Sequence, residues 1–150
     1  MSTFADPDVR AACLERLDRL APNTQRQWGK MTPHQMVCHL RDSFRTVQGD
    51  LPASDVSNPF TRTVIRFIAL RTPMKWPAGA RTVPELDYDL GAGTPPAEWE
   101  RDIAELRDQI TQFGDRTSFE AHPIFGKLPI RDWMVWGYRH VDHHFRQFGI

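Results

Sequence analysis

The spacing of hydrophobic positions predicts a chain built from helices. Apolar residues recur every three or four positions in four segments, residues 7–20, 33–48, 95–113 and 133–150, as in amphipathic helices that pack on one face. A shorter apolar run over residues 59–70 predicts a subsidiary helix packed on the others. No alternating strand pattern and no internal repeat is visible. The pattern therefore predicts an all-α fold, a bundle of four main helices and one subsidiary helix.

Prolines indicate where these helices begin. In four places a side chain that can cap a helix precedes a proline suited to the first helical position: Asp6-Pro7, Thr32-Pro33, Asn58-Pro59 and Thr94-Pro95. Gln35 completes a capping box with Thr32, and Gly49 and Gly114 are suited to end their helices. A fifth start near Pro129 lacks a good capping residue. On the helix over residues 95–113, the pattern predicts one solvated acidic face: Asp102, Glu105 and Asp108.

The segment over residues 72–93 interrupts this helical pattern. It contains three prolines and three glycines, and loops of this length within a compact domain are often functional. We expect an ordered loop that covers part of the bundle. Trp76 in this loop either lines a pocket or pins the loop to the core.

The last helix carries three of the six histidines. His140 and His144 lie about 40° apart around the helix axis, one turn apart and within the apolar arc. His143 falls on the charged side, which predicts that it faces solvent. Two inward histidines one turn apart can bind one metal ion, although buried histidines can also be hydrogen-bonded core residues. A catalytic metal site needs a third protein ligand from elsewhere in the chain.

The second helix offers that ligand. His39 borders its apolar face, whereas His34 is predicted to face solvent. Asp42 is less well aimed and is a candidate hydrogen-bond acceptor for a ligating imidazole. His122 is an alternative ligand, a proton carrier, part of the pocket wall or a partner of the backbone, since Pro123 holds it in an extended conformation.

Three stretches resemble the DinB/YfiT-like superfamily, and within it a bacterial branch whose biochemistry is undefined. They are Met31-Thr32-Pro33-His34-Gln35-Met36-Val37-Cys38-His39-Leu40, His122-Pro123-Ile124-Phe125-Gly126 and His140-Val141-Asp142-His143-His144-Phe145-Arg146-Gln147-Phe148. The resemblance extends from about residue 28 to the C-terminus and implies a four-helix bundle with one long crossover. It also implies a metal triad of one histidine from the second helix and two from the last, which correspond to His39, His140 and His144. Residues 59–70 and the loop after them would be an elaboration of that fold.

Three neutral imidazoles would suit Zn²⁺, Ni²⁺ or Fe²⁺. The resemblance implies a metal-dependent transferase or hydrolase acting on a small molecule. Our leading hypothesis is a transferase in which the metal activates a low-molecular-weight thiol toward an electrophile, with four candidates to bind the carboxylates of the thiol: Arg41, Arg45, Lys75 and Arg81. Metal-assisted hydrolysis is an alternative, although no carboxylate base is obvious beside the triad. The second alternative is a non-catalytic dimer stabilised by its metal.

Composition limits the classes of binding partner that we expect. The 150 residues are expected to form a single domain, residues 1–150, and the zero net charge without a basic stripe argues against nucleic-acid binding. No apolar run of about 18 residues and no signal peptide is present, so we expect a cytoplasmic protein without a membrane partner. Cys13 and Cys38 lie in separate helical patterns and are expected to be buried, reduced thiols. The resemblance implies a homodimer.

Overall fold

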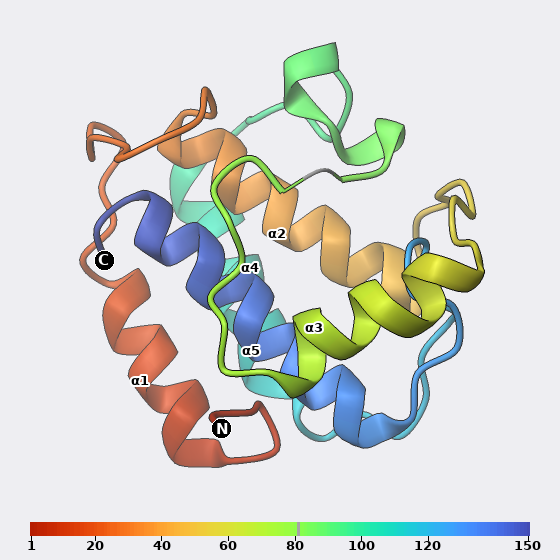
Figure 1. Cartoon of the computed structure of the whole chain (residues 1–150). Coiled ribbons are helices and arrows are strands. Elements are labelled where there is room, and N and C mark those ends of the chain that lie inside the picture. The colour runs from red at the N-terminus through yellow and green to blue at the C-terminus, as the bar shows by residue number, and fades with distance from the viewer. Residues whose placement is uncertain (81) are drawn as a thin grey trace.

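The computed structural model describes residues 1–80 and 82–150, and this part of the chain is helical (Figure 1). Apart from an isolated bridge between His122 and Gly126, the described residues form no β-structure. The helical elements are α1 (Pro7–Leu17), α2 (Pro33–Gln48), the π-helix η1 (Thr61–Ile65), α3 (Arg66–Arg71), the 3₁₀ helices η2 (Pro84–Leu86) and η3 (Tyr88–Leu90), α4 (Trp99–Phe113) and α5 (Ile130–Gln147). The prediction of an all-α helical bundle is confirmed.

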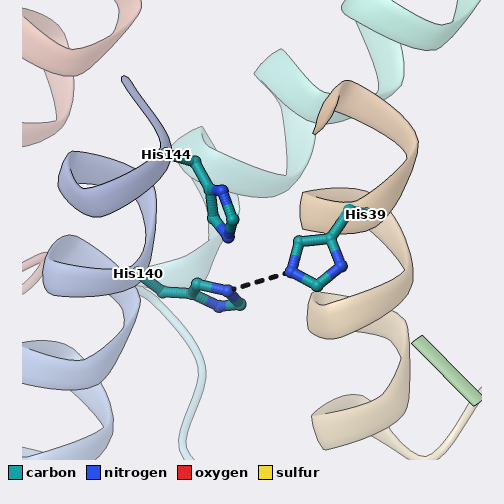
Figure 2. A group of neighbouring side chains, drawn as sticks. All are labelled: His39, His140 and His144. Atoms are coloured by element: carbon teal, nitrogen blue, oxygen red, sulfur yellow. Dashed lines mark hydrogen bonds between the residues drawn. The ribbon is translucent and has the colours of Figure 1, made fainter. Parts of the chain in front are cut away.

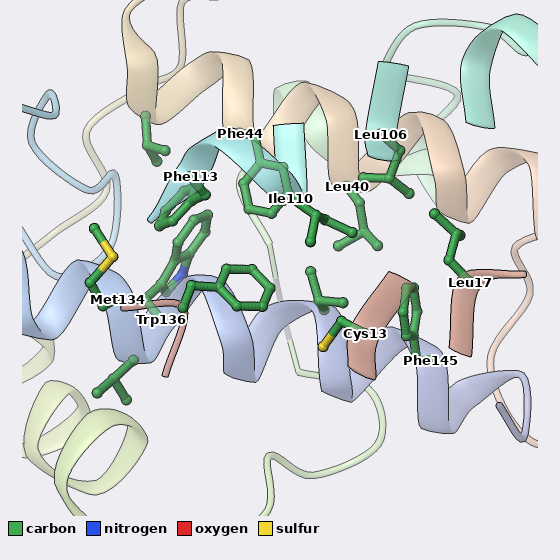
Figure 3. Close-up of a cluster of buried hydrophobic side chains, with 14 of the residues drawn as sticks. Cys13, Leu17, Leu40, Phe44, Leu106, Ile110, Phe113, Met134, Trp136 and Phe145 are labelled. Carbon is green, nitrogen blue, oxygen red and sulfur yellow. The ribbon is translucent and has the colours of Figure 1, made fainter. Parts of the chain in front are cut away.

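Four of these helices, α1, α2, α4 and α5, surround one hydrophobic core (Figure 3). The core includes large side chains from each of them, all at most 1% exposed: Leu17, Leu40, Phe44, Leu106, Ile110, Phe113 and Phe145. A long crossover, residues 49–98, joins α2 to α4 and contains η1, α3, η2 and η3. None of the helices in the described residues is long and apolar enough to cross a membrane.

The start of α2 is fixed by local hydrogen bonds. Thr32 Oγ1 accepts a hydrogen bond from the Gln35 backbone N–H at 3.1 Å, and Gln35 Oε1 accepts one from the Thr32 N–H at 2.9 Å. At the other end Gly49 adopts φ = 90°, a left-handed conformation that costs little for glycine. The predicted capping box and C-cap are therefore present, and α2 begins and ends where the sequence predicts.

Close contact with the aromatic core fixes the position of α5. A Cβ atom added at Gly137 would lie 2.7 Å from the Phe113 ring and 2.9 Å from the Phe4 ring. Because this is closer than van der Waals contact, only glycine allows α5 to approach so near. The approach also positions the side chains that follow on α5, His140 and His144.

Three predicted helix ends are wrong, among them that of α5, which ends at Gln147 rather than at residue 150. The helix predicted from residue 95 begins at Trp99, because the N–H and Oγ1 of Thr94 bond to the Asp42 carboxylate at 2.7 and 2.8 Å instead of capping a helix. The first helix ends at Leu17 rather than at residue 20. As expected, α5 begins after Pro129 without a side-chain cap.

The predicted subsidiary helix is present as η1 followed by α3, but it is held mainly by polar contacts. Only Leu70 of α3 is buried. The carboxylate of Asp132 on α5 pairs with Arg71 at 2.8 Å and with Arg66 at 3.5 Å. Arg139 on α5 donates hydrogen bonds to the backbone carbonyls of Ala69, Thr72 and Met74. The segment after α3 then crosses in front of α5 (Figure 1), so it forms the predicted cover.

Candidate metal centre

Three histidines from two helices converge between α2 and α5 (Figure 2). His39 from α2 and His144 from α5 are buried, at 4% and 7% exposure, while His140 is partly exposed. The Nε2 atoms of His39 and His140 lie 3.3 Å apart, and the potential ligand atoms of all three residues lie within 4.8 Å of one another. The structure thus brings together the three residues named from the sequence. That they bind a metal stays a prediction.

Neighbouring groups orient two of these imidazoles. His39 Nδ1 donates to the Leu86 carbonyl at 3.1 Å, and His144 Nδ1 donates to Gln147 Oε1 at 2.9 Å. The Gln147 amide is itself oriented, because its Nε2 donates to the Trp28 carbonyl at 3.1 Å. Since both acceptors lack a hydrogen, the imidazole proton lies on Nδ1 and the lone pair on Nε2. Such bonds to the far nitrogen are typical of histidines that bind metals.

The acceptor predicted for this role, Asp42, is not used. Its carboxylate accepts hydrogen bonds from Thr94, and a backbone carbonyl from η2 serves His39 instead. The helical wheel could rank the acidic side chains near His39, but it could not place the loop carbonyl of Leu86.

Burial keeps the three imidazoles neutral. It lowers the pKa of His39, and it lowers the pKa of His140 and of His144 far below the usual range, with a further decrease from the neighbouring histidines. A neutral imidazole is the form that binds a metal. At neutral pH the site therefore needs no proton loss before an ion binds.

The geometry fits a divalent ion. In a tetrahedral site with metal–nitrogen bonds of about 2.0–2.1 Å, two ligating nitrogens lie about 3.3 Å apart. The Nε2 atoms of His39 and His140 have this separation. In addition, Nδ1 of His140 is buried and has no hydrogen-bond partner among the described residues, while its Nε2 is hydrogen-bonded to Nε2 of His39 (Figure 2), a contact that an ion between the two rings would replace.

A cavity of about 1000 Å³ adjoins the histidines. Its wall is largely apolar and combines the crossover, the turn before α5 and α5 itself: Ile65, Ile68, Met74, Trp76, Phe125 and Trp136. This is large enough for a small-molecule ligand. Trp76 has both roles considered for it, since it lines the cavity while its indole N–H donates to the Ala69 carbonyl at 3.0 Å.

His143 does not face solvent, contrary to the prediction. It is 5% exposed and its ring lies 5.9 Å from the Trp28 ring and 6.1 Å from the Trp76 ring. Burial lowers its pKa to about 4. The error arises because the loop containing Trp76 covers the side of α5 that a helical wheel assigns to water.

His122 lines the cavity but lies outside the three-histidine group. Its Nδ1 accepts hydrogen bonds from the backbone N–H groups of Ile124 and Phe125 at 3.0 and 3.2 Å. Burial lowers its pKa to about 3, so the ring is neutral at neutral pH and its hydrogen is on Nε2. Of the roles considered for His122, the structure supports the wall and the backbone partner, whereas a pKa of about 3 is too low for a proton carrier near neutral pH.

His34 and Asp102 are also wrongly predicted to face solvent. His34 Nε2 lies 2.8 Å from Asp102, whose side chain is 1% exposed. Arg41 lies 2.8 Å from the same carboxylate, and Cys38 Sγ lies 3.8 Å from it. The cause is that α4 packs on this side of α2. Glu105 and Asp108 on α4 are exposed, as predicted.

The four candidate anion-binding residues lie in different places. Arg41 is buried against Asp102 and Glu105, away from the cavity. Arg45 lies near Asp42 and does not line the cavity. Lys75 does line it, and Arg81 lies outside the described residues.

The sequence interpretation missed one carboxylate at the cavity. Asp87, between η2 and η3, is partly buried, lines the cavity and is close enough to His39 to favour its protonated form. It directly follows Leu86, whose carbonyl orients His39. The only signal in the sequence was its place in the segment expected to cover the bundle.

The two cysteines are free and buried, as expected. Burial raises the pKa of each thiol to about 11. Neither is therefore a thiolate at neutral pH.

Comparison with known proteins supports one assignment. Searches among curated proteins and among solved structures gave no match. A family model described as the DinB superfamily matches residues 7–148, a span that includes α1 to α5. The chain belongs to the DinB superfamily.

Proposed function

We propose that His39, His140 and His144 hold a divalent ion, Zn²⁺, Ni²⁺ or Fe²⁺, and that the protein transfers a low-molecular-weight thiol to a small-molecule electrophile. The observation that carries this proposal is the convergence of neutral, inward-facing imidazoles beside a cavity of about 1000 Å³. A closed structural site would have four protein ligands and no cavity. Three ligands and an adjacent cavity favour catalysis.

The bound ion and the residues around the cavity would each have a different role in thiol transfer. The bound ion would supply Lewis acidity that lowers the pKa of the thiol. Lys75 offers a cation for a carboxylate of that thiol. His122 has its Nδ1 engaged by the backbone, so the Nε2–H is left to donate to a polar atom of the electrophile. The apolar wall of Trp76, Trp136 and their neighbours holds the electrophile and excludes water.

The first test is metal content per chain in protein purified without a histidine tag. We expect about one ion per chain, and its loss in His39→Ala and in His144→Ala. His122→Ala is the matched control, because it removes another buried histidine from the same cavity and should retain the ion. Retention of the ion in both His39→Ala and His144→Ala would reject the assigned ligands.

The second test is thiol transfer by the metal-loaded protein. A chromogenic aryl halide is mixed with cysteine or another thiol that carries a carboxylate, and conjugate formation is followed by absorbance. We expect turnover that needs the ion, and Lys75→Ala should raise KM for the thiol more than it lowers kcat. A metal-loaded protein that forms no conjugate with any such thiol would contradict the transferase proposal.

Hydrolysis is the second candidate, and Asp87 is the observation that favours it. This carboxylate lines the cavity close to His39, where it could act as a general base toward water. Turnover of activated esters without thiol, abolished by Asp87→Asn with metal content retained, would support a hydrolase over a transferase.

A further inference from the structure

One stretch of the crossover differs in charge from the rest of the chain. Between Asp55 and Glu85 the sequence contains no acidic residue, but it contains four arginines and one lysine. The whole chain has zero net charge. Positive charge is thus concentrated where η1, α3 and the loop after them lie.

The same stretch exposes large apolar side chains. Phe60 and Phe67 are 59% and 61% exposed, Val64 is 44% exposed and Met74 is 63% exposed. These fractions are unusual for a short segment of a folded protein, and clustered exposed apolar residues commonly mark an interaction site. Leu70 is the only buried residue of α3.

Basic residues lie on the same segments and on the neighbouring start of α5. Arg66 donates a hydrogen bond to the Lys127 carbonyl, which places the start of α5 beside α3. Six basic residues lie on η1 and α3, in the loop after α3 and around the start of α5: Arg62, Arg66, Arg71, Lys75, Lys127 and Arg131. They contact two carboxylates, those of Asp55 and Asp132, which leaves a surplus of four positive charges. No acidic side chain among the described residues lies within 4.0 Å of the cationic group of Lys75, Lys127 or Arg131.

We propose that this basic apolar face docks on the surface of an anionic lipid bilayer. Its apolar members are Phe60, Val64, Phe67, Ile68 and Met74, and its charged members are the six basic residues named above. Exposed aromatic and aliphatic side chains insert at the boundary between head groups and acyl chains, while basic side chains bind anionic head groups. A chain without net charge would adopt one orientation on such a surface, with this face toward the lipid.

The charge of the face also argues against a second copy as its occupant. A two-fold symmetric contact places each surface against itself, so the surplus positive charges of the two copies would oppose each other. An anionic bilayer instead complements both features of the face. The earlier expectation that the protein has no membrane partner rested on the lack of a spanning segment, and a peripheral surface needs no such segment.

Docking would orient the cavity as well. Ile65, Ile68 and Met74 line the cavity and are exposed to solvent. The mouth of the cavity would then lie at the lipid surface. This inference does not depend on the reaction catalysed in the cavity.

The test is sedimentation of the full chain with vesicles of phosphatidylcholine alone or mixed with phosphatidylglycerol. We expect binding to the mixed vesicles to be at least roughly tenfold stronger, and to be lost at about 1 M NaCl, where the Debye length is about 3 Å. The double variants Phe60→Ser/Phe67→Ser and Lys127→Glu/Arg131→Glu should each lose most of this binding. Leu90→Ser, which changes another side chain that is 71% exposed, and Arg19→Glu should bind as the unchanged protein does.

Three results would overturn the proposal. They are no binding to mixed vesicles, equal binding to both kinds of vesicle, and equal loss in the control variants. Sedimentation equilibrium of the same proteins tests the other occupant. A dimer that Phe60→Ser/Phe67→Ser converts to monomer, without vesicle binding by the unchanged protein, would assign the face to a second copy of the chain.

Discussion

Helix α2 contributes to two histidine-containing groups that differ in how their polar atoms are satisfied. On one side His39 meets His140 and His144, and on another His34 meets Asp102. Both groups have donor atoms suited to a metal and close enough to share one. In the second group, however, Asp102 already accepts from His34 and from Arg41, each at 2.8 Å.

The difference shows that ligand types and spacing do not identify a metal site by themselves. The Asp102 carboxylate is neutralised by a buried guanidinium, which would repel an added cation. The three imidazoles of the first group carry no charge, and one ring nitrogen of each lies within 4.8 Å of those of the other two, beside a cavity. We therefore expect the first group to bind metal and the second to stabilise the contact between α2 and α4.

Replacing Asp102 should have the largest effect on folding. Asp102→Ala leaves Arg41 buried with only the half-exposed Glu105 carboxylate beside it, and breaking a buried ion pair in this way costs about 3–5 kcal/mol of unfolding free energy. Urea denaturation measures this loss, and metal content should be unchanged. Glu105→Ala is the control, since the Glu105 side chain is 47% exposed and its removal should cost about 1 kcal/mol or less.

The same carboxylate predicts a pH dependence. Burial opposes its ionisation, but hydrogen bonds from His34, from the Ala97 N–H and from Arg101 outweigh burial and lower the pKa of Asp102 to about 2. A folded-state pKa below the ordinary value of 3.8 means that the ionised form favours folding. This contribution is complete above about pH 4 and is lost as the pH falls toward 2. Asp102→Asn should flatten the stability curve in that range, and an unchanged curve would contradict the assignment.

Removing the metal should have the next largest effect, and only through the first group. At a free metal concentration about 100 times Kd, binding adds about 2.7 kcal/mol to the stability of the folded state. A chelator should lower Tm accordingly, by about 2–4 °C per kcal/mol for a chain of this size. His39→Ala should abolish the response to chelator, whereas His34→Ala should keep it while lowering Tm. If His34→Ala abolished the response to chelator and His39→Ala kept it, the second group would be the metal site and the first would not.

The sequence predicted the three-histidine group but not the other one, for a physical reason. Helical periodicity locates the side chains that face the core, and His39, His140 and His144 all lie at or within an apolar arc. It cannot show which neighbouring element covers the remaining sides of a helix. His34, Asp102 and His143 were therefore assigned to solvent, although the contact between α2 and α4 buries Asp102 and partly covers His34, and the loop with Trp76 covers the buried His143.

Capping residues predicted the start of a helix correctly where no tertiary contact competed for the capping side chain. The capping box at Thr32 is present as predicted, whereas Thr94 is hydrogen-bonded to the Asp42 carboxylate and does not cap a helix. Both sequences have the same Thr-Pro signature. A carboxylate 52 residues distant in the chain made the difference, and no reading of the local sequence contains that information.

Gln147 offers a smaller and more selective perturbation of the first group. It orients His144 without belonging to the triad. Gln147→Ala should weaken metal affinity by about 10–100-fold, the usual effect of removing a hydrogen-bond partner of a ligand. Competition with a chromophoric chelator measures this change. Gln147→Glu, which keeps an acceptor for His144 Nδ1, should restore most of the affinity, and equal losses in both variants would contradict the orienting role.

Replacing Cys38 should have the smallest effect on stability, and Cys38 also offers the most direct test of whether the second group binds metal. Its thiol lies 3.8 Å from Asp102, and burial raises its pKa to about 11, so it is protonated at neutral pH. Cys38→Ser should therefore change stability by only about 1 kcal/mol and leave metal content unaltered. The rate of alkylation of Cys38 can be measured in Cys13→Ala protein, where Cys38 is the only thiol, at several urea concentrations that expose it to different degrees. We expect added zinc to leave this rate unchanged. A cysteine that binds zinc is a thiolate and does not react with an alkylating agent while it is bound. If zinc slowed alkylation of Cys38 even in His39→Ala, the zinc ion would have to be bound by Cys38 and Asp102 in place of Arg41. The second group would then be a metal site as well.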